Sequence, residues 1–385
     1  SLHMGLVTMG AGQCGSEVFT LTEEYKPMVR RSIADFSCVP LEKVEVDWLN
    51  LGEWRKKLET KGTAANIAPF VGFGNLRRIV IGVEGKGGER YEPTEAEMNQ
   101  MKGMLDEQMR YGAFGMCTGL RYSEQRNAYT DEVIELTKVV AKYGGIYISH
   151  MRSEEDALIE ACKELIEICE KVGVRGCFSH HKALFPENWG KPSETMRLID
   201  RARERGVEIY CDQYCQPYAR EANLGSWFVR HALAPETAEA IAPPTVDDIL
   251  KAIKDPEKWK EIKKKAVEAH EKEVAKNEER KKALGKRGVK VPEIWNPETF
   301  DYIVYSKTRP DLVGKNFREV AQAMGIEDYW DAVRDLYIAD DGNTLVAAGG
   351  ISEDDVITIL KHPTSSVSTD DWSLDWVPSM RSPGT

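Results

Sequence analysis

Short apolar runs alternate with longer amphipathic stretches through the middle of the chain. Four runs of four or five residues are largely apolar: 113–117, 146–149, 176–179 and 207–211. The stretches between them repeat their apolar residues with a helical period. Strands this short, joined by helices, are typical of parallel βα units. The pattern therefore predicts an α/β fold with a parallel sheet.

The amphipathic stretches also carry helix-start and helix-stop residues. Thr94 and Glu97 form a capping box, and the helix behind it has one apolar face made of Met98, Met101, Leu105 and Met109. Methionines spaced in this way are far more often core residues than part of a cofactor site. A second helix begins at Thr130 and ends at Gly144-Gly145, which cannot readily continue a helix.

The regular alternation breaks at Pro243-Pro244. From there the chain is rich in Lys and Glu with a helical period, and we interpret residues 243–296 as a helical insertion. Its single apolar stripe consists of Trp259, Ile262, Ala266, His270 and Val274. The insertion is either a solvated excursion with one docking face or a lid over an active site. The βα pattern resumes at residues 302–305, and a last strand is expected at 365–368.

Composition narrows the class of protein. The chain has 385 residues and a net charge of −11, which disfavours contact with nucleic acid or anionic membranes. It has no apolar run near the about 20 residues of a membrane span, and residues 1–4 lack the charged and apolar regions that would lead us to expect a signal peptide. The eight cysteines include no C-x-x-C pair, as expected for reduced thiols in a cytoplasmic protein.

Chemically useful side chains gather where the predicted strands end. His150 follows one strand, His180 and His181 follow the next, and Asp370 follows the last, while Cys14 follows an apolar run near the start. In a parallel barrel the strand ends meet on one face, which is where catalytic groups lie. Imidazole, thiolate and carboxylate are zinc ligands. An aspartate beside such a site could move a proton between water and a leaving amine.

These motifs resemble those of the N-acyl-D-amino acid deacylases (D-aminoacylases) of the amidohydrolase superfamily. The resemblance runs along nearly the whole chain and is strongest in the His150-Met151-Arg152 and Ser179-His180-His181-Lys182 segments. Further matching segments are residues 72–77, 117–122, 312–316 and 352–356. The family fold is a (β/α)8 TIM-type barrel, so residues 1–385 are expected to form its strands two to eight.

The resemblance implies a role for each site residue. Cys14, His150 and His180 would bind one zinc ion tightly, and Asp370 would be the general acid/base. Lys182, Tyr214 and Arg381 match the positions that bind the substrate's α-carboxylate and polarise the scissile carbonyl. Tyr218 competes with Tyr214, because the segment 212–218 is longer than in the family. His181 is expected to lie beside the ligands rather than among them.

The implied activity is hydrolysis of the linear amide bond of N-acyl-D-amino acids, which releases a D-amino acid and a carboxylate. Two alternatives stay open: a cyclic-amide hydrolase similar to hydantoinase or dihydroorotase, and a non-catalytic degenerate barrel. The partner is then a small-molecule substrate, and a homo-oligomer is possible. Lys182 and Arg381 favour an open-chain substrate that carries a carboxylate.

The chain departs from the family at both ends. It contains no His-x-His, the motif that ends the family's first strand, and Phe73 replaces a common histidine. The flanking β-sandwich has no counterpart. We therefore expect a barrel that is incomplete at both termini, either because the chain is a fragment or because oligomerisation closes the gap. Without the His-x-His pair, only the Cys14/His150/His180 metal position can be built.

Overall fold

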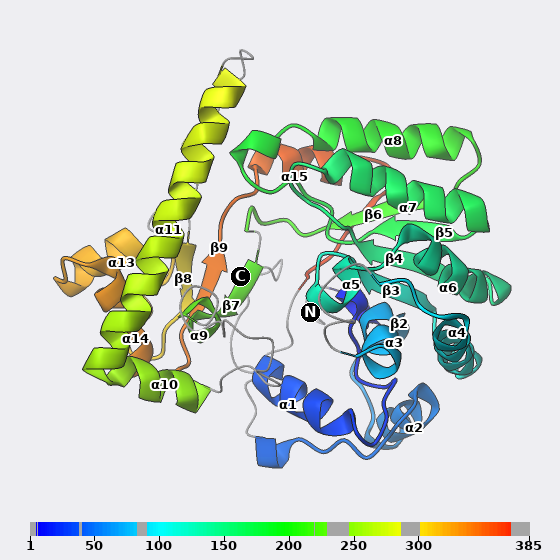
Figure 1. The fold of residues 1–385 in the computed structure, drawn as a ribbon, viewed down its shortest axis with the longest axis horizontal. Coiled ribbons are helices and arrows are strands. Elements are labelled where there is room, and N and C mark those ends of the chain that lie inside the picture. Colours follow the sequence, from blue (N-terminus) through cyan, green and yellow to red (C-terminus); the bar gives the residue numbers. More distant parts are fainter. Residues whose placement is uncertain are drawn as a thin grey trace.

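Seven parallel strands form the main sheet of the computed structural model, which describes residues 5, 7–37, 41–82, 91–218, 220–228, 246–285 and 301–370. The strand order is β1-β2-β3-β4-β5-β6-β10 (Figure 1). The first six strands each lie beside the preceding strand of the chain, whereas β10 pairs with β6 across an excursion that contains three further strands. The strands are β1 (Thr8–Ala11), β2 (Asn66–Gly72), β3 (Gly115–Gly119), β4 (Ile146–His150), β5 (Arg175–Phe178), β6 (Ile209–Gln213) and β10 (Ser365–Val367). This is the expected order of a TIM-type barrel. Within the described residues, no pairing joins β10 to β1.

Helices connect and cover these strands. They are α1 (Lys26–Ser37), α2 (Leu51–Lys61), α3 (Phe73–Val80), α4 (Glu95–Arg110), α5 (Ser123–Arg126), α6 (Thr130–Lys142), α7 (Leu158–Val172), α8 (Pro192–Glu204) and α15 (Glu353–Leu360). The capping box of Thr94 and Glu97 is present at the start of α4. The predicted inner face of α4 is buried at Met101, Leu105 and Met109, within one core shared with α6, α7 and α8.

A smaller domain interrupts the barrel between β6 and β10. It contains an antiparallel sheet of order β7-β9-β8, formed by β7 (Arg220–Asn223), β8 (Asp301–Tyr305) and β9 (Leu345–Ala348). Five helices accompany this sheet: α9 (Leu224–Phe228), α10 (Val246–Lys254), α11 (Pro256–Gly285), α13 (Phe317–Met324) and α14 (Tyr329–Ala339). Their apolar side chains form a second core, separate from that of the barrel. Figure 1 shows the two domains beside each other, with α11 projecting beyond them.

The prediction that the βα pattern resumes at residues 302–305 is wrong. These residues do form a strand, but β8 pairs antiparallel with β9 in the small domain and not with the barrel. A short apolar run indicates a strand without indicating its partner. The predicted capping box at Asn316 and Glu319 is present, and it begins α13 of the same small domain.

The described part of the 243–296 insertion consists of α10 and α11. Trp259, Ile262 and Ala266, from the predicted apolar stripe, are buried in the small-domain core. Trp259 also donates its indole N–H to Asp331 at 2.7 Å. The side chains of His270 and Val274, and residues 243–245 and 286–296, lie outside the described residues. The described stripe is therefore a packing face of the small domain.

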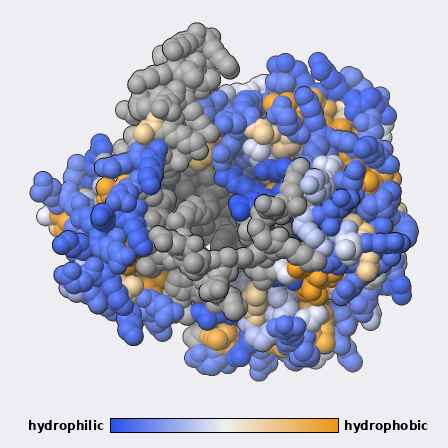
Figure 2. Space-filling model, in the orientation of Figure 1, coloured by the Kyte–Doolittle hydropathy of each residue, from blue (hydrophilic) through white to orange (hydrophobic). Residues whose placement is uncertain are grey.

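One face of the described surface is largely hydrophilic (Figure 2), and the described cysteines are unpaired thiols. Hydrophilic residues cover most of the described surface on the face shown in Figure 2. None of the described helices has the length and apolar character needed to cross a membrane. The cysteines in the described part of the chain are free thiols, and most of them are buried.

Close packing between β3 and β4 leads to a test of the barrel. A Cβ built on Gly115 would lie 1.8 Å from the carbonyl oxygen of Ile146, its partner on β4. We expect Gly115→Ala to lower the free energy of unfolding by about 1–3 kcal/mol, because the backbone of β4 must move. Chemical denaturation measures the change.

Gly103 provides the matched control. It lies on the exposed side of α4, where an added Cβ would meet nothing within 4 Å. Gly103→Ala should raise the stability by about 0.4–1 kcal/mol, because alanine has the higher helix propensity and restricts the unfolded chain. Equal effects of the two substitutions would contradict the packing argument.

Candidate metal site at the carboxyl ends of the strands

Three neighbouring parts of the barrel place Cys14, His150 and His180 close together. His150 is the last residue of β4, and His180 follows β5 by two residues. Parallel pairing aligns the two strands, and beyond the last pair Ser179 donates its N–H to the Ser149 carbonyl at 3.0 Å. Cys14 lies in a single 3-10 turn, Gln13–Gly15, directly after β1. All three residues therefore stand at the carboxyl ends of parallel strands.

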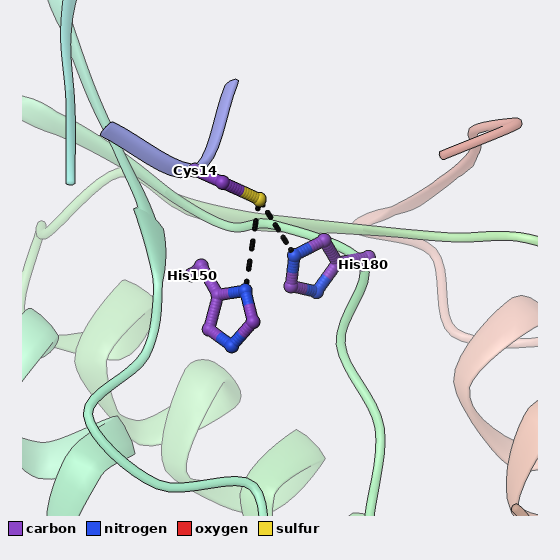
Figure 3. Close-up of side chains that lie close together, drawn as sticks. All are labelled: Cys14, His150 and His180. Atoms are coloured by element: carbon purple, nitrogen blue, oxygen red, sulfur yellow. Dashed lines mark hydrogen bonds between the residues drawn. The ribbon is translucent and has the colours of Figure 1, made fainter. Parts of the chain in front are cut away.

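The side chains of the three residues converge (Figure 3). The Cys14 Sγ atom lies 3.6 Å from Nδ1 of His150 and 3.3 Å from Nε2 of His180. The two imidazole rings meet nearly at right angles, with their centroids 4.4 Å apart. One donor atom from each residue falls within 4.8 Å of the other two, and no other such group occurs among the described residues.

The backbone at this site is held in an uncommon conformation. Among the described residues other than glycine, five have positive φ, and three of these belong to the predicted site: Cys14 at 58°, His180 at 37° and Asp370 at 47°. Left-handed backbone is unfavourable for most side chains, and such residues tend to cluster at functional sites. The surrounding contacts must therefore maintain these conformations.

Those contacts come from Asp212, Gln125 and Gly119. The Asp212 carboxylate accepts the His180 N–H at 2.8 Å. The buried Gln125 donates to the Cys14 carbonyl at 3.3 Å and accepts the Gly119 N–H at 2.5 Å. A Cβ on Gly119 would lie 2.1 Å from the Cys14 carbonyl oxygen, so only glycine lets the turn approach β3 this closely.

Charges around the cluster favour a thiolate. Burial raises the pKa of the Cys14 thiol, but the neighbouring His180 and His150 outweigh this effect and lower that pKa to about 6. Burial and Lys182 lower the pKa of His180, whereas Asp370 and Cys14 raise it, with a net value of about 10. Cys14 is therefore an anionic sulfur donor at neutral pH.

Glu154 lies behind the two histidines, on the side away from Cys14. Its carboxylate is 3.4 Å from Nε2 of His150 and 3.2 Å from Nδ1 of His180. It also pairs with the Lys182 ammonium at 2.6 Å. Burial raises the pKa of Glu154, but His150 and Lys182 outweigh it and hold that pKa well below its usual range. The carboxylate is therefore ionised among three partners.

The other predicted site residues have different surroundings. Lys182 is only 3% exposed, and its ammonium lies 5.7 Å from the ring of the fully buried Tyr214. Tyr218 is half-buried and packs against Tyr302 of the small domain. Asp370 lies near enough to raise the pKa of both His180 and Lys182. Arg381 lies outside the described residues.

His181 does not join the cluster. It is fully buried, its Nε2 atom lies 2.6 Å from Oγ1 of Thr195, and its ring stacks obliquely on Phe178. Burial, followed by the charge of Lys182, lowers the pKa of His181 to about 3, so the ring is neutral. It packs between Phe178 of β5 and Thr195 of α8.

Sequence reasoning missed Glu154, Gln125 and Tyr122. The Tyr122 hydroxyl lies 3.2 Å from Nδ1 of His150, beside the donor cluster. Tyr122 is the last residue of segment 117–122, which carries part of the family resemblance. Glu154 comes two residues after the His150-Met151-Arg152 segment and four after His150. An acidic residue close after a candidate ligand is the signal that could have found Glu154.

The chain is similar in sequence to curated deacylases. It is 34% identical over 184 residues to an N-acyl-D-glutamate deacylase of Alcaligenes xylosoxydans xylosoxydans, a match that covers 48% of this chain and 35% of the relative. It is 30% identical over 228 residues to an N-acyl-D-aspartate deacylase of the same organism, a match that covers 58% of this chain and 42% of that relative. The chain thus spans less than half the length of these relatives. No protein-family model matches it.

Solved structures show the same fold. The N-acyl-D-glutamate deacylase of Bordetella bronchiseptica, solved with zinc and a phosphonate mimic of the tetrahedral intermediate, superimposes with a TM-score of 0.59 at 24% identity. A D-aminoacylase described as defining a subset of amidohydrolases gives 0.58 at 21%. Each alignment covers 96% of this chain and 60% of the other. The chain is therefore similar in sequence to curated N-acyl-D-amino acid deacylases, and it shares the fold of the solved N-acyl-D-glutamate deacylase and D-aminoacylase.

Proposed function

We propose that the protein hydrolyses the amide bond of N-acyl-D-amino acids with a zinc ion bound by Cys14, His150 and His180. The observation that carries this proposal is the convergence of one thiol and two imidazoles at the carboxyl ends of the barrel strands. Sequence relatives named for deacylation of N-acyl-D-glutamate and N-acyl-D-aspartate support the choice of substrate. The zinc and phosphonate bound to the Bordetella bronchiseptica enzyme support a metal-dependent reaction.

The three donors fit zinc in kind and in spacing. Zinc binds sulfur at about 2.3 Å and histidine nitrogen at about 2.0–2.1 Å, so sulfur and nitrogen ligands at a tetrahedral angle lie about 3.5 Å apart. The two sulfur–nitrogen distances here are 3.6 and 3.3 Å. Three protein ligands leave the fourth position open, as in catalytic zinc sites.

When bound, zinc supplies Lewis-acid activation of water and of the scissile carbonyl. In the proposed mechanism Asp370 accepts a proton from the attacking water and passes it to the nitrogen of the leaving D-amino acid, a role typically worth about 10²–10⁴ in rate. Its position after β10, within electrostatic reach of His180 and Lys182, supports this assignment.

Lys182, Tyr214 and Arg381 are the proposed substrate-binding residues. The Lys182 ammonium lies 2.7 Å from the His180 ring, so its positive charge stands directly beside the donor cluster. A substrate carboxylate or a polarised carbonyl oxygen close to the metal would be stabilised by that charge. The Tyr214 ring lies 5.7 Å from this ammonium, so we prefer it to Tyr218, which packs on the small domain.

Metal content tests the donor set directly. We expect about one tightly bound zinc ion per chain, and its loss in Cys14→Ser and in His180→Asn, because each substitution removes one of three protein ligands. Elemental analysis after dialysis measures the content. Cys215→Ser, which removes an exposed thiol outside the cluster, should keep its zinc. A wild-type chain that binds no zinc would refute the proposal.

Turnover tests the role of Asp370. We expect Asp370→Asn to retain zinc and to lower kcat for an N-acyl-D-amino acid by at least about 10², because the amide cannot carry the proton. Asparagine tolerates the left-handed backbone of position 370, which keeps the variant a fair comparison. Unchanged turnover would remove Asp370 from the mechanism.

The same assay, run on the wild-type enzyme, separates the substrate classes. The protein should release free amine from N-acyl-D-amino acids and leave hydantoins and dihydroorotate intact. The opposite preference would identify a cyclic-amide hydrolase. No turnover of any of these amides by the zinc-loaded protein would identify a non-catalytic barrel.

The reactivity of Cys14 gives a pH-dependent test. The thiolate is the nucleophilic form, and the pKa of about 6 means that Cys14 should remain a thiolate down to about pH 6 and lose reactivity below it. In the zinc-free protein we expect half-maximal alkylation of Cys14 by iodoacetamide near pH 6, measured by mass spectrometry of its peptide. Added zinc should protect Cys14. A half-maximal rate near 9.0, the ordinary value for a thiol, would contradict the electrostatic argument.

A further inference from the structure

One buried carboxylate contacts both histidines of the donor cluster. Glu154 lies in the loop between β4 and α7 and is 2% exposed. Its Oε2 atom is 3.4 Å from Nε2 of His150, and its Oε1 atom is 3.2 Å from Nδ1 of His180. Each histidine thus turns one ring nitrogen toward Cys14 and the other toward Glu154.

The two histidines face the Cys14 sulfur through different ring nitrogens. His150 faces the sulfur through Nδ1, whereas His180 faces it through Nε2. A ligating nitrogen must carry a lone pair, so the hydrogen of each neutral ring has to sit on the nitrogen that faces Glu154. The two rings therefore need different tautomers, and a single acceptor placed between them can stabilise both.

The Lys182 ammonium lies within hydrogen-bond distance of both Glu154 and the His180 ring. The ammonium lies 2.6 Å from Oε1 of Glu154, 2.9 Å from the His180 carbonyl oxygen and 2.7 Å from Nδ1 of His180. If Lys182 donated a hydrogen to Nδ1, the hydrogen of His180 would move to Nε2 and block the metal position. Donation to the carboxylate is stronger, because both partners are charged. Glu154 therefore competes with the His180 ring for the Lys182 hydrogens.

The surroundings fit a carboxylate and not an amide. Arg121 adds a further positive charge 3.6 Å from Oε2, while its other terminal nitrogen pairs with Glu155 at 2.5 Å. Glu154 thus faces four donor groups: two imidazoles, an ammonium and a guanidinium. A glutamine would offer one oxygen and turn an NH₂ group toward other donors.

We propose that Glu154 is a positioning residue that fixes the tautomers of His150 and His180 and anchors Lys182, and that it thereby sets the zinc affinity of the site. This inference rests on the proposed function, because it assumes zinc at Cys14, His150 and His180. Partners that orient metal-binding histidines typically contribute 10–100-fold to metal affinity. One carboxylate that serves two ligands should reach the upper part of that range.

Zinc affinity of the full chain is the main test. We expect Glu154→Gln to raise the zinc dissociation constant by about 10–100-fold, measured by competition with a chromophoric chelator. Glu154→Asp keeps the charge on a shorter side chain and should lie between the wild type and Glu154→Gln. Thermal unfolding of the zinc-free proteins reports any general loss of stability.

Glu155→Gln is the matched control. Glu155 is the adjacent residue, has the same chemistry and pairs with the same arginine. Within the described part of the chain, its side chain forms no ion pair or hydrogen bond with either histidine or with Lys182. Its zinc dissociation constant should stay within about twofold of the wild type, below the range expected for a partner of a ligand. Equal zinc affinity in Glu154→Gln and Glu155→Gln would overturn the proposal.

Nitrogen NMR of the wild-type protein tests the tautomers without any substitution at Glu154. With histidine labelled by ¹⁵N and zinc bound, the hydrogen of His150 should be on Nε2 and that of His180 on Nδ1. His150→Asn and His180→Asn spectra assign the signals. A hydrogen on the opposite nitrogen of either ring would overturn the proposal, even if Glu154→Gln fails to fold.

These results are separable from the fate of the proposed reaction. A zinc-loaded wild type that hydrolyses no N-acyl-D-amino acid would refute the deacylase activity and would leave the zinc titrations and the tautomers as evidence for Glu154. Conversely, unchanged zinc affinity in Glu154→Gln would refute the role of Glu154 and leave the deacylase activity standing.

Discussion

The parallel pairing of β4 with β5 is the constraint on which the rest of the site depends. Both strands end at the same edge of the sheet, and the register that pairs Ser149 with Phe178 sets His150 beside the turn that carries His180. Side chains alternate between the two faces of a strand, so a slip by one residue would turn His150 away from its partners. The hydrogen bond from Ser179 to Ser149 extends this register into the loop.

The backbone around the donors is strained, and tight packing maintains the strain. Cys14, His180 and Asp370 all have positive φ, and each such residue costs about 1–3 kcal/mol unless its surroundings fix it. The Cys14 turn is held against β3 by Gln125 and by the missing side chain of Gly119. His180 is held through its amide by Asp212. The stability of the barrel core therefore supports the conformation of the donors.

Much of the fold could be predicted from the sequence, because it is encoded locally. The hydrophobic period, the capping box at Thr94 and the histidines at strand ends are all visible within a few residues. The pairing of β8 was predicted wrongly because it depends on β9, about 40 residues later in the chain. The site could be predicted only in part, because several of its contacts also join residues that are distant in the sequence. Glu154 and Gln125 look like ordinary polar residues until the strands bring their partners together.

The donors and Asp370 reach the site by different routes along the chain. Cys14, His150 and His180 lie at the carboxyl ends of β1, β4 and β5, within the continuous part of the chain that forms the first five strands. Asp370 is positioned by β10, which pairs with β6 only after the chain has passed through the whole small domain.

This difference has a consequence for the order of assembly. Closing a longer loop adds little free energy, about 0.6 kcal/mol for each doubling of its length, so the excursion through the small domain costs the native state little. Folding is affected more, because contacts that are distant in sequence form slowly. During synthesis the N-terminal part of the chain is made first and can begin to fold first. The three donors can therefore gather while the strand that carries Asp370 is still unpaired, so the proposed metal site would form before the proposed acid/base residue reaches it.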